Sequence, residues 1–218
     1  LALGFRRGSE TCAHLAVLHC NVGLDPGHAL YSPCTLDDLR RTGMDYWALG
    51  HIHAQRVLSS GEMWAVYPGC LQGRSLKPSE QGVKGAFVGA IEQGRVSSAS
   101  FVPVPHVRFV EVAVDVAGVA DMPGLVNRLE GEAASEVSSA TTRGLVIRAR
   151  LTGREAIHTD LRVPGATEEL LRILREEAAG QRPFVWWCAV RDETQAELDR
   201  DGILRRGDFS AELIGLVE

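Results

Sequence analysis

The chain has 218 residues, 45% of them hydrophobic, so it is long enough to bury a sizeable core in one or two domains. Its net charge of -5 argues against indiscriminate attraction to polyanions, although local basic patches can oppose the average. The five cysteines show no Cys-x-x-Cys spacing and no stretch approaches the roughly 18 apolar residues of a membrane helix, so we expect a cytoplasmic protein with reduced thiols and no membrane contact.

The first half of the chain predicts a strand-rich domain with one clear helix. Residues 35–43 should form that helix, because Thr35 can cap it, its first turn is acidic, its last turn is basic and Gly43 can end it. Turn residues separate the short apolar runs around this helix. Strands are expected at 13–20, 44–49, 56–58, 64–67, 85–91 and 96–104.

A second unit should begin at residue 106, because Pro103 and Pro105 exclude a regular central strand. Thr167 is the expected N-cap of its most convincing helix. Trp186 and Trp187 are adjacent in a strand, so one indole should enter the core and the other should face outward. Strands are expected at 107–116, 144–151 and 184–190, and helices at 119–137 and 167–175. The order of these elements predicts a small open α/β layer. For the whole chain we expect an α/β (α+β) fold, divided into residues 1–105 and 106–218.

Histidines follow two of the predicted strands. His51 and His53 follow the strand expected at 44–49, just beyond Gly50, and side chains two apart in an extended backbone point the same way. His19 ends the strand at 13–20, so two strands bring imidazoles to one edge of a sheet. The pattern favours a metal site, and the alternative is an ordinary pair of hydrogen-bonded histidines. A further alternative gives Cys20 or Cys34 a role as soft ligand or nucleophile.

These residues carry a family resemblance. A strand ending in His19, the segment 45–53 with its Gly-His-x-His element, and Tyr67-Pro68-Gly69 together resemble the calcineurin-like metallophosphoesterases. Within them the chain is similar to the DNA repair exonuclease family typified by SbcD, in its YhaO-like branch. The segments Asn21-Val22-Gly23, Tyr31-Ser32-Pro33-Cys34 and Lys84-Gly85 also match. The likeness is close over the first half and loose over the second, and Gly-His-x-His specifies the superfamily better than the substrate.

The resemblance implies a fold and a departure from the family pattern. The chain should be the later half of a metallophosphoesterase β-sandwich with flanking helices, followed by a small α/β capping domain. Such enzymes begin with an Asp-x-His strand, a bridging aspartate and an Asn-His-Asp or Asn-His-Glu turn, none of which this sequence contains. We therefore expect the catalytic residues and the first ligands to lie upstream, and the chain alone to be inactive.

The resemblance also implies a ligand set. It places His19 and His51 on one divalent ion and His53 on the other, with manganese as the expected metal and magnesium, iron or zinc as alternatives. Asn21 could orient His19 or contact a phosphate, or it could simply make a turn. Arg74 could bind a phosphate through its guanidinium, or it could be an ordinary exposed arginine.

The function implied is that of a metal-dependent DNA exonuclease or endonuclease, a phosphodiester hydrolase of DNA repair. DNA and an SMC-like ATPase subunit are the expected partners, with a possible homodimer formed through the upstream half. One alternative is a phosphoesterase that acts on small phosphodiesters or phosphoproteins. Another is that the chain alone works as a non-catalytic module that binds DNA or a partner.

Overall fold

The computed structural model describes residues 1–23, 30–104, 106–139, 142–197 and 205. The chain falls into two compact units. Unit 1 comprises Leu1–Val110 with Ala140–Val146 and Arg182–Phe184, and unit 2 comprises Glu111–Ser139, Ile147–Gln181 and Val185–Glu218. Pro105, at the predicted boundary, lies outside the described residues. The assignment of the two parts to a nuclease domain and a capping domain stays a prediction.

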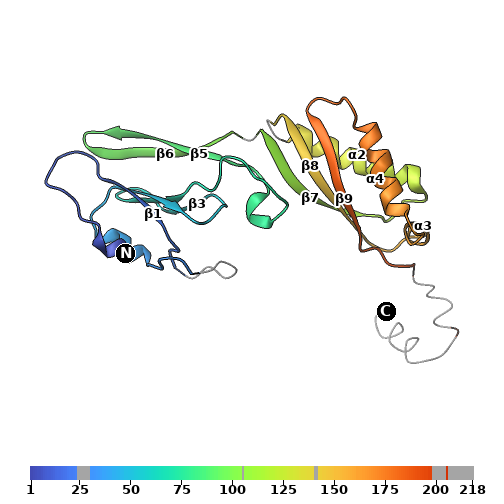
Figure 1. The fold of residues 1–218 in the computed structure, drawn as a ribbon, viewed down its shortest axis with the longest axis horizontal. Coiled ribbons are helices and arrows are strands. Elements are labelled where there is room, and N and C mark those ends of the chain that lie inside the picture. The colour runs from blue at the N-terminus through green and yellow to red at the C-terminus, as the bar shows by residue number, and fades with distance from the viewer. Residues whose placement is uncertain (24–29, 105, 140–141, 198–204, 206–218) are drawn as a thin grey trace. The chain divides into compact units, whose positions relative to one another are not determined.

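Unit 1 is built on a four-stranded mixed sheet, part of which is labelled in Figure 1. Its strands, in the order in which they pair, are β1 (Leu15–His19), β2 (Tyr46–Gly50), β4 (Trp64–Tyr67) and β3 (Arg56–Ser59). The first three run parallel, whereas β3 pairs antiparallel with β4. The register of β1 and β2 sets His19 opposite Gly50, so the carboxyl ends of these two strands lie side by side.

Helix α1 (Leu36–Arg40) connects β1 to β2 and is capped as predicted. The hydroxyl of Thr35 accepts a hydrogen bond from the backbone N–H of Asp38 at 3.1 Å, and the Asp38 carboxylate accepts one from the Thr35 N–H at 2.9 Å. This reciprocal arrangement satisfies two N–H groups that the helix itself leaves unpaired. Leu39 is fully buried, which ties the helix to the core around Trp47.

A separate two-stranded sheet completes unit 1. It is the antiparallel hairpin of β5 (Gly85–Glu92) and β6 (Arg95–Pro103), which follows the short 3-10 helix η2 (Pro78–Glu80). Residues of the four-stranded sheet and of the hairpin together line an apolar cavity of about 520 Å³, with Leu15 and Ala48 on one side and Phe87 and Ile91 on the other. The unit therefore holds two sheets, with helical segments beside them.

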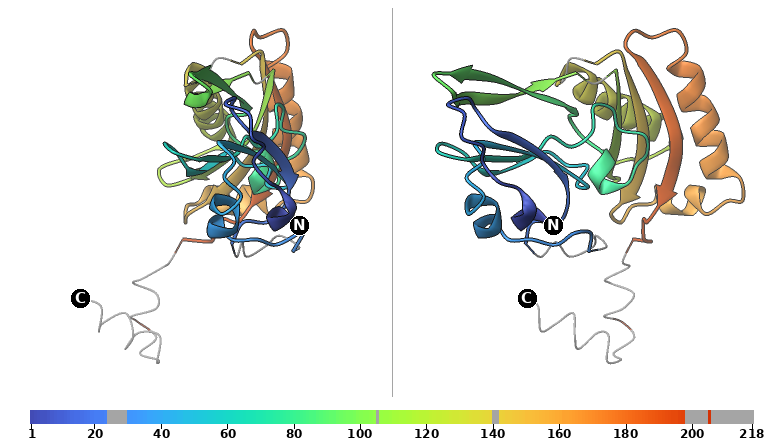
Figure 2. Two further views of the ribbon diagram at one scale, coloured as in Figure 1. Left: turned by 90° about the vertical axis from the view of Figure 1, so that its left-hand side faces the viewer. Right: turned by 60° about the vertical axis from the view of Figure 1, so that its left-hand side comes forward.

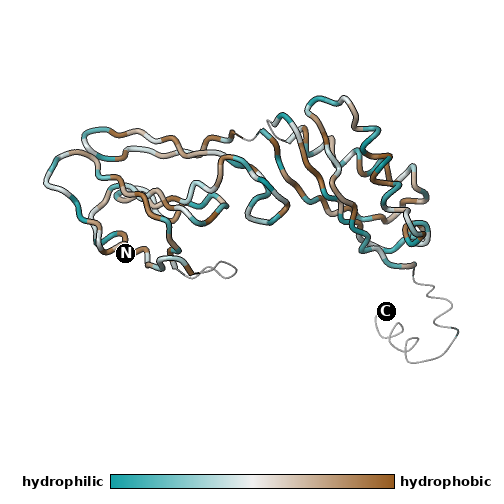
Figure 3. The backbone as a smooth tube through the Cα atoms, viewed as in Figure 1, coloured by the Kyte–Doolittle hydropathy of each residue, from teal (hydrophilic) through white to brown (hydrophobic). Residues whose placement is uncertain are grey.

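Unit 2 contains most of a three-stranded sheet, with helices against one face of it (Figures 1 and 2). Alternate residues of the central strand are completely buried, and α2 and α4 contribute buried leucines to the same core. Figure 3 shows hydrophobic residues gathered along the strands, whereas polar and apolar positions alternate along α4. The elements, in chain order, are β7 (Val107–Asp115), α2 (Met122–Ser138), β8 (Gly144–Thr152), α3 (Ile157–Leu161), α4 (Ala166–Glu177) and β9 (Phe184–Asp192), with the strands paired in the order β7-β8-β9. The α/β fold is confirmed.

Unit 2 shows the outcome of two predictions, the N-cap of α4 and the placement of the two tryptophans. The expected cap of α4 is wrong: the helix begins at Ala166 after Gly165, whose φ of +84° turns the chain, so Thr167 already lies inside the first turn. The tryptophan prediction is confirmed, because Trp187 is 1% exposed and Trp186 is 49% exposed.

The one-turn helix α3 was not predicted, since five residues are too few to show helical periodicity. Among the described residues, no helix is both long enough and apolar enough to cross a membrane.

Candidate metal site

His19 and His51 meet at the ends of β1 and β2. The Nε2 atom of His19 lies 3.3 Å from Nδ1 of His51, and the ring centroids are 5.2 Å apart. The strand register brings them together, because His19 is paired with the residue just before His51. That residue must be small: a Cβ on Gly50 would lie 2.9 Å from Nδ1 of His19. The sequence prediction that two strands deliver imidazoles to one edge agrees with this arrangement.

The backbone of His51 has an unusual conformation. Its φ of +100° lies in the region that favours glycine, and only Ser32 and Gln93 share a positive φ among the other described non-glycine residues. A side chain held in this region typically costs 1–3 kcal/mol and persists where the surroundings or a function demand it. The turn directs the chain out of β2 at the point where the two histidines meet.

The aromatic ring of Tyr31 packs against both histidines. It lies edge-on to His19 with a centroid separation of 5.0 Å, and it stacks on His51 at 6.0 Å. The Tyr31 side chain is 54% exposed, so the three rings form a partly open cluster rather than part of the core. The cluster limits how far either imidazole can rotate.

His53 has a different partner. Its Nδ1 atom lies 2.5 Å from Oε1 of Glu80, and the His53 side chain is 44% exposed while that of Glu80 is 7% exposed. Burial alone would raise the pKa of Glu80, but hydrogen bonds from His53 and from the backbone N–H of Arg74 outweigh it, so the pKa is lowered. Glu80 is therefore an ionised acceptor. Glu80 was not among the predicted site residues, because nothing local to Ser79-Glu80-Gln81 points to a histidine 27 residues earlier.

His51 and His53 line one polar cavity of about 620 Å³ in unit 1. Its other lining residues are Arg74, Ser75, Lys77, Ser79 and Glu80. Arg74 and Lys77 are exposed, so two cationic side chains border the space beside two imidazoles. The structure thus brings Arg74 to the predicted site, although its role as a phosphate ligand stays a prediction. Lys77 was not among the predicted site residues.

Asn21 is buried and holds a loop together. Its side-chain Oδ1 accepts a hydrogen bond from the Tyr31 N–H at 2.6 Å, and its backbone bonds to Tyr31 and Cys34. In the part of the chain that the structure describes, its Nδ2 has no hydrogen-bond partner. These contacts are those of the turn-making alternative, and a contact with phosphate stays a prediction.

The neighbouring cysteines are thiols in contact with each other. The Cys34 and Cys20 sulfur atoms are 3.9 Å apart, and burial raises the pKa of the Cys20 thiol to about 12. Burial also raises the pKa of Cys34. Because the thiolate is the form that binds metals and attacks electrophiles, both residues are poor candidates for either task at neutral pH.

The histidines fit only part of a divalent-metal site. Imidazole nitrogens are common ligands of transition metals, and three of them lie at or next to one cavity. Within the described ranges, however, no group of three or more His, Cys, Asp or Glu side chains is arranged to hold a metal ion. The Glu80 carboxylate is engaged by His53 and Arg74. Any complete site therefore needs oxygen ligands beyond those the described residues place here.

Comparison with known proteins gives two matches. The family model described as "Metallophosphoesterase YhaO, middle domain" matches residues 109–195, which cover most of β7 and all of β8 and β9. The protein described as "Uncharacterized metallophosphoesterase YhaO" from Bacillus subtilis (strain 168) is 35% identical over 198 residues. That alignment covers 90% of this chain and 47% of the relative, so the chain spans about half the length of the protein it matches.

Proposed function

Starting from the metallophosphoesterase family that these matches support, we propose that the chain contributes part of a divalent-metal site that hydrolyses phosphodiesters in DNA. The observation that carries the proposal is the meeting of His19 and His51 at the ends of two parallel strands, beside a cavity that His51 shares with His53. Histidines grouped on a cavity with nearby cations are suited to an anionic substrate.

The chemistry that such a site must perform is the attack of water on an anionic phosphorus atom. Divalent metal, when bound, lowers the pKa of water and neutralises charge that develops on the phosphoryl oxygens. His19, His51 and His53 would hold it. Arg74 and Lys77, on the border of the cavity, would attract and orient the phosphate groups of the substrate.

The finer parts of the proposal rest on the family resemblance. They are manganese as the metal, exonuclease or endonuclease action in DNA repair, a cytoplasmic location, and an SMC-like ATPase and a second copy of the protein as partners. Two neighbouring cations favour a substrate with more than one phosphate, as in a nucleic acid backbone, over a small phosphodiester or a phosphoprotein.

The test is cleavage by the full-length gene product with Mn²⁺ on three substrates: end-labelled DNA, a small chromogenic phosphodiester and a phosphopeptide. We expect DNA to be cleaved, and we expect His51→Ala and His53→Ala each to abolish cleavage while the fold remains intact, because each removes a metal ligand. His106→Ala is the matched control, since this exposed histidine of unit 1 does not line the cavity.

Three outcomes would contradict parts of the proposal. Undiminished cleavage by both cavity variants would reject the histidines as ligands. Hydrolysis of only the small diester or the phosphopeptide would reject DNA as the substrate. Turnover by this chain alone would reject the expectation that further groups are needed.

A further inference from the structure

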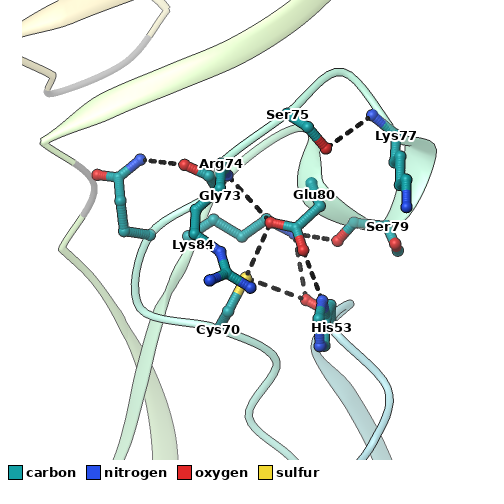
Figure 4. A network of polar contacts seen from close by, with 10 residues as sticks. His53, Cys70, Gly73, Arg74, Ser75, Lys77, Ser79, Glu80 and Lys84 are labelled. Atoms are coloured by element: carbon teal, nitrogen blue, oxygen red, sulfur yellow. Dashed lines mark hydrogen bonds and ion pairs between the residues drawn. The ribbon is translucent and has the colours of Figure 1, made fainter.

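The carboxylate of Glu80 has specific contacts on both of its oxygens (Figure 4). Oε1 lies 2.5 Å from Nδ1 of His53, and Oε2 accepts the backbone N–H of Arg74 at 3.0 Å and the Cys70 thiol at 3.9 Å. Glu80 is only 6% exposed. A buried carboxylate is rare unless it is paired, and the contacts of Glu80 with His53 and Arg74 account for its burial.

Lys84 holds the backbone of the same histidine. Its buried ammonium group donates to the carbonyl oxygen of His53 at 3.2 Å and to that of Ser79 at 2.5 Å. The loop carrying His53 is also packed tightly, because a Cβ on Gly69 would lie 2.6 Å from the His53 carbonyl oxygen. His53 is thus fixed at its ring by Glu80 and at its backbone by Lys84, on a loop that has no regular secondary structure.

The hydrogen bond to Glu80 determines which nitrogen of His53 is available. An ionised carboxylate only accepts hydrogen bonds, so the Nδ1 atom facing it must carry the proton. A neutral imidazole with a proton on Nδ1 presents the lone pair of Nε2. Carboxylates that accept the second N–H of a metal-binding histidine orient the ring in this way in many metalloproteins.

We propose that Glu80 is a positioning residue for His53: it accepts the Nδ1 proton, fixes the plane of the ring and leaves Nε2 as the nitrogen that binds a divalent cation in the cavity. This role rests on the proposed function, in which His53 is a ligand. Lys84 and Gly69 support it by fixing the loop. A purely structural Glu80, retained only to bond the Arg74 N–H, would have no effect on the protonation pattern of the ring.

The direct test is ¹⁵N NMR of the histidine rings in this chain without metal, at a pH where neutral imidazole dominates. We expect wild-type His53 to carry its proton on Nδ1. In Glu80→Gln the side-chain amide can offer its NH₂ group to the ring, and in Glu80→Ala no acceptor remains, so both should shift His53 toward the Nε2-protonated form. Glu80→Asp, which keeps the charge, should restore part of the wild-type pattern. Glu92→Gln makes the same chemical change at an exposed site of unit 1 and should leave the spectrum unchanged.

A proton on Nε2 of wild-type His53 would overturn the proposal without any variant, so the test does not depend on whether Glu80→Ala folds. The second measurement is titration of the full-length gene product with Mn²⁺ alone, where Glu80→Gln should weaken binding by about 10- to 100-fold. Unchanged binding would overturn the positioning role. If the wild-type protein shows the Nδ1 proton but binds no metal, the proposed function fails while the pairing of Glu80 with His53 stands.

Discussion

The backbone of His51 allows a sharp test of whether the site stores strain. We compare His51→Gly with His51→Ala, because both remove the imidazole but only glycine adopts a φ of +100° without strain. A non-glycine residue there costs about 1–3 kcal/mol. Glycine costs about 0.5–1 kcal/mol through its greater flexibility in the unfolded chain. His51→Gly should therefore be more stable than His51→Ala by about 1 kcal/mol, the difference of these two effects.

His53 supplies the matched control, since its φ lies outside the positive region. There the order should reverse, with His53→Ala more stable than His53→Gly by about 0.5–1 kcal/mol. The assay is native-state hydrogen exchange in increasing urea, followed on peptides from β1, β2 and β4 so that unit 1 is measured by itself. If His51→Ala proved more stable than His51→Gly, as expected at position 53, the argument that His51 is held in a strained conformation would be refuted.

Two further predictions concern the stability of unit 1. Thr35→Ala removes the capping hydroxyl of α1 and should destabilise unit 1 by about 1 kcal/mol in the same exchange assay, and an unchanged stability would mean that the cap contributes nothing. Tyr67→Phe should cost about 1–3 kcal/mol at neutral pH, because the buried phenol accepts from the Val22 N–H at 2.9 Å and donates to the Cys20 carbonyl at 2.8 Å. Burial raises the pKa of Tyr67 from its ordinary value of 10.0 to about 12, so its stabilising effect is complete below pH 10 and is lost as the pH rises toward 12. Between pH 10 and 12 the free energy of unfolding, measured in urea, should fall less in Tyr67→Phe than in the wild-type protein. An equal fall in both proteins would contradict the raised pKa of Tyr67.

Local patterns in the sequence predicted most of the fold. Apolar runs bounded by turn residues located the strands, and the cap at Thr35 followed from residue types within one turn. The meeting of His19 and His51 was also predictable, because both follow apolar strands and such strand ends gather at one edge. The start of α4 was missed, because glycine at φ +84° replaced the expected side-chain cap.

The parts that could not be predicted depend on contacts between loops. Glu80 ends the short 3-10 helix η2, 27 residues after His53, and neither periodicity nor spacing encodes their contact. The positive φ of His51 is equally invisible in the sequence, since few non-glycine residues adopt such a conformation and glycine is the usual signal for it. Sequence patterns therefore located the histidines that meet at the strand ends, whereas the orientation of their rings required coordinates.

The in-register pairing of β1 with β2 has a consequence for how this protein can vary. Successive side chains of a strand alternate between its two faces, so deleting one residue inside β1 would turn His19 away from His51. Insertions in the connections between strands leave that alignment untouched. Relatives that retain the histidine pair should therefore differ in the length of their surface loops while the two strands keep a constant length.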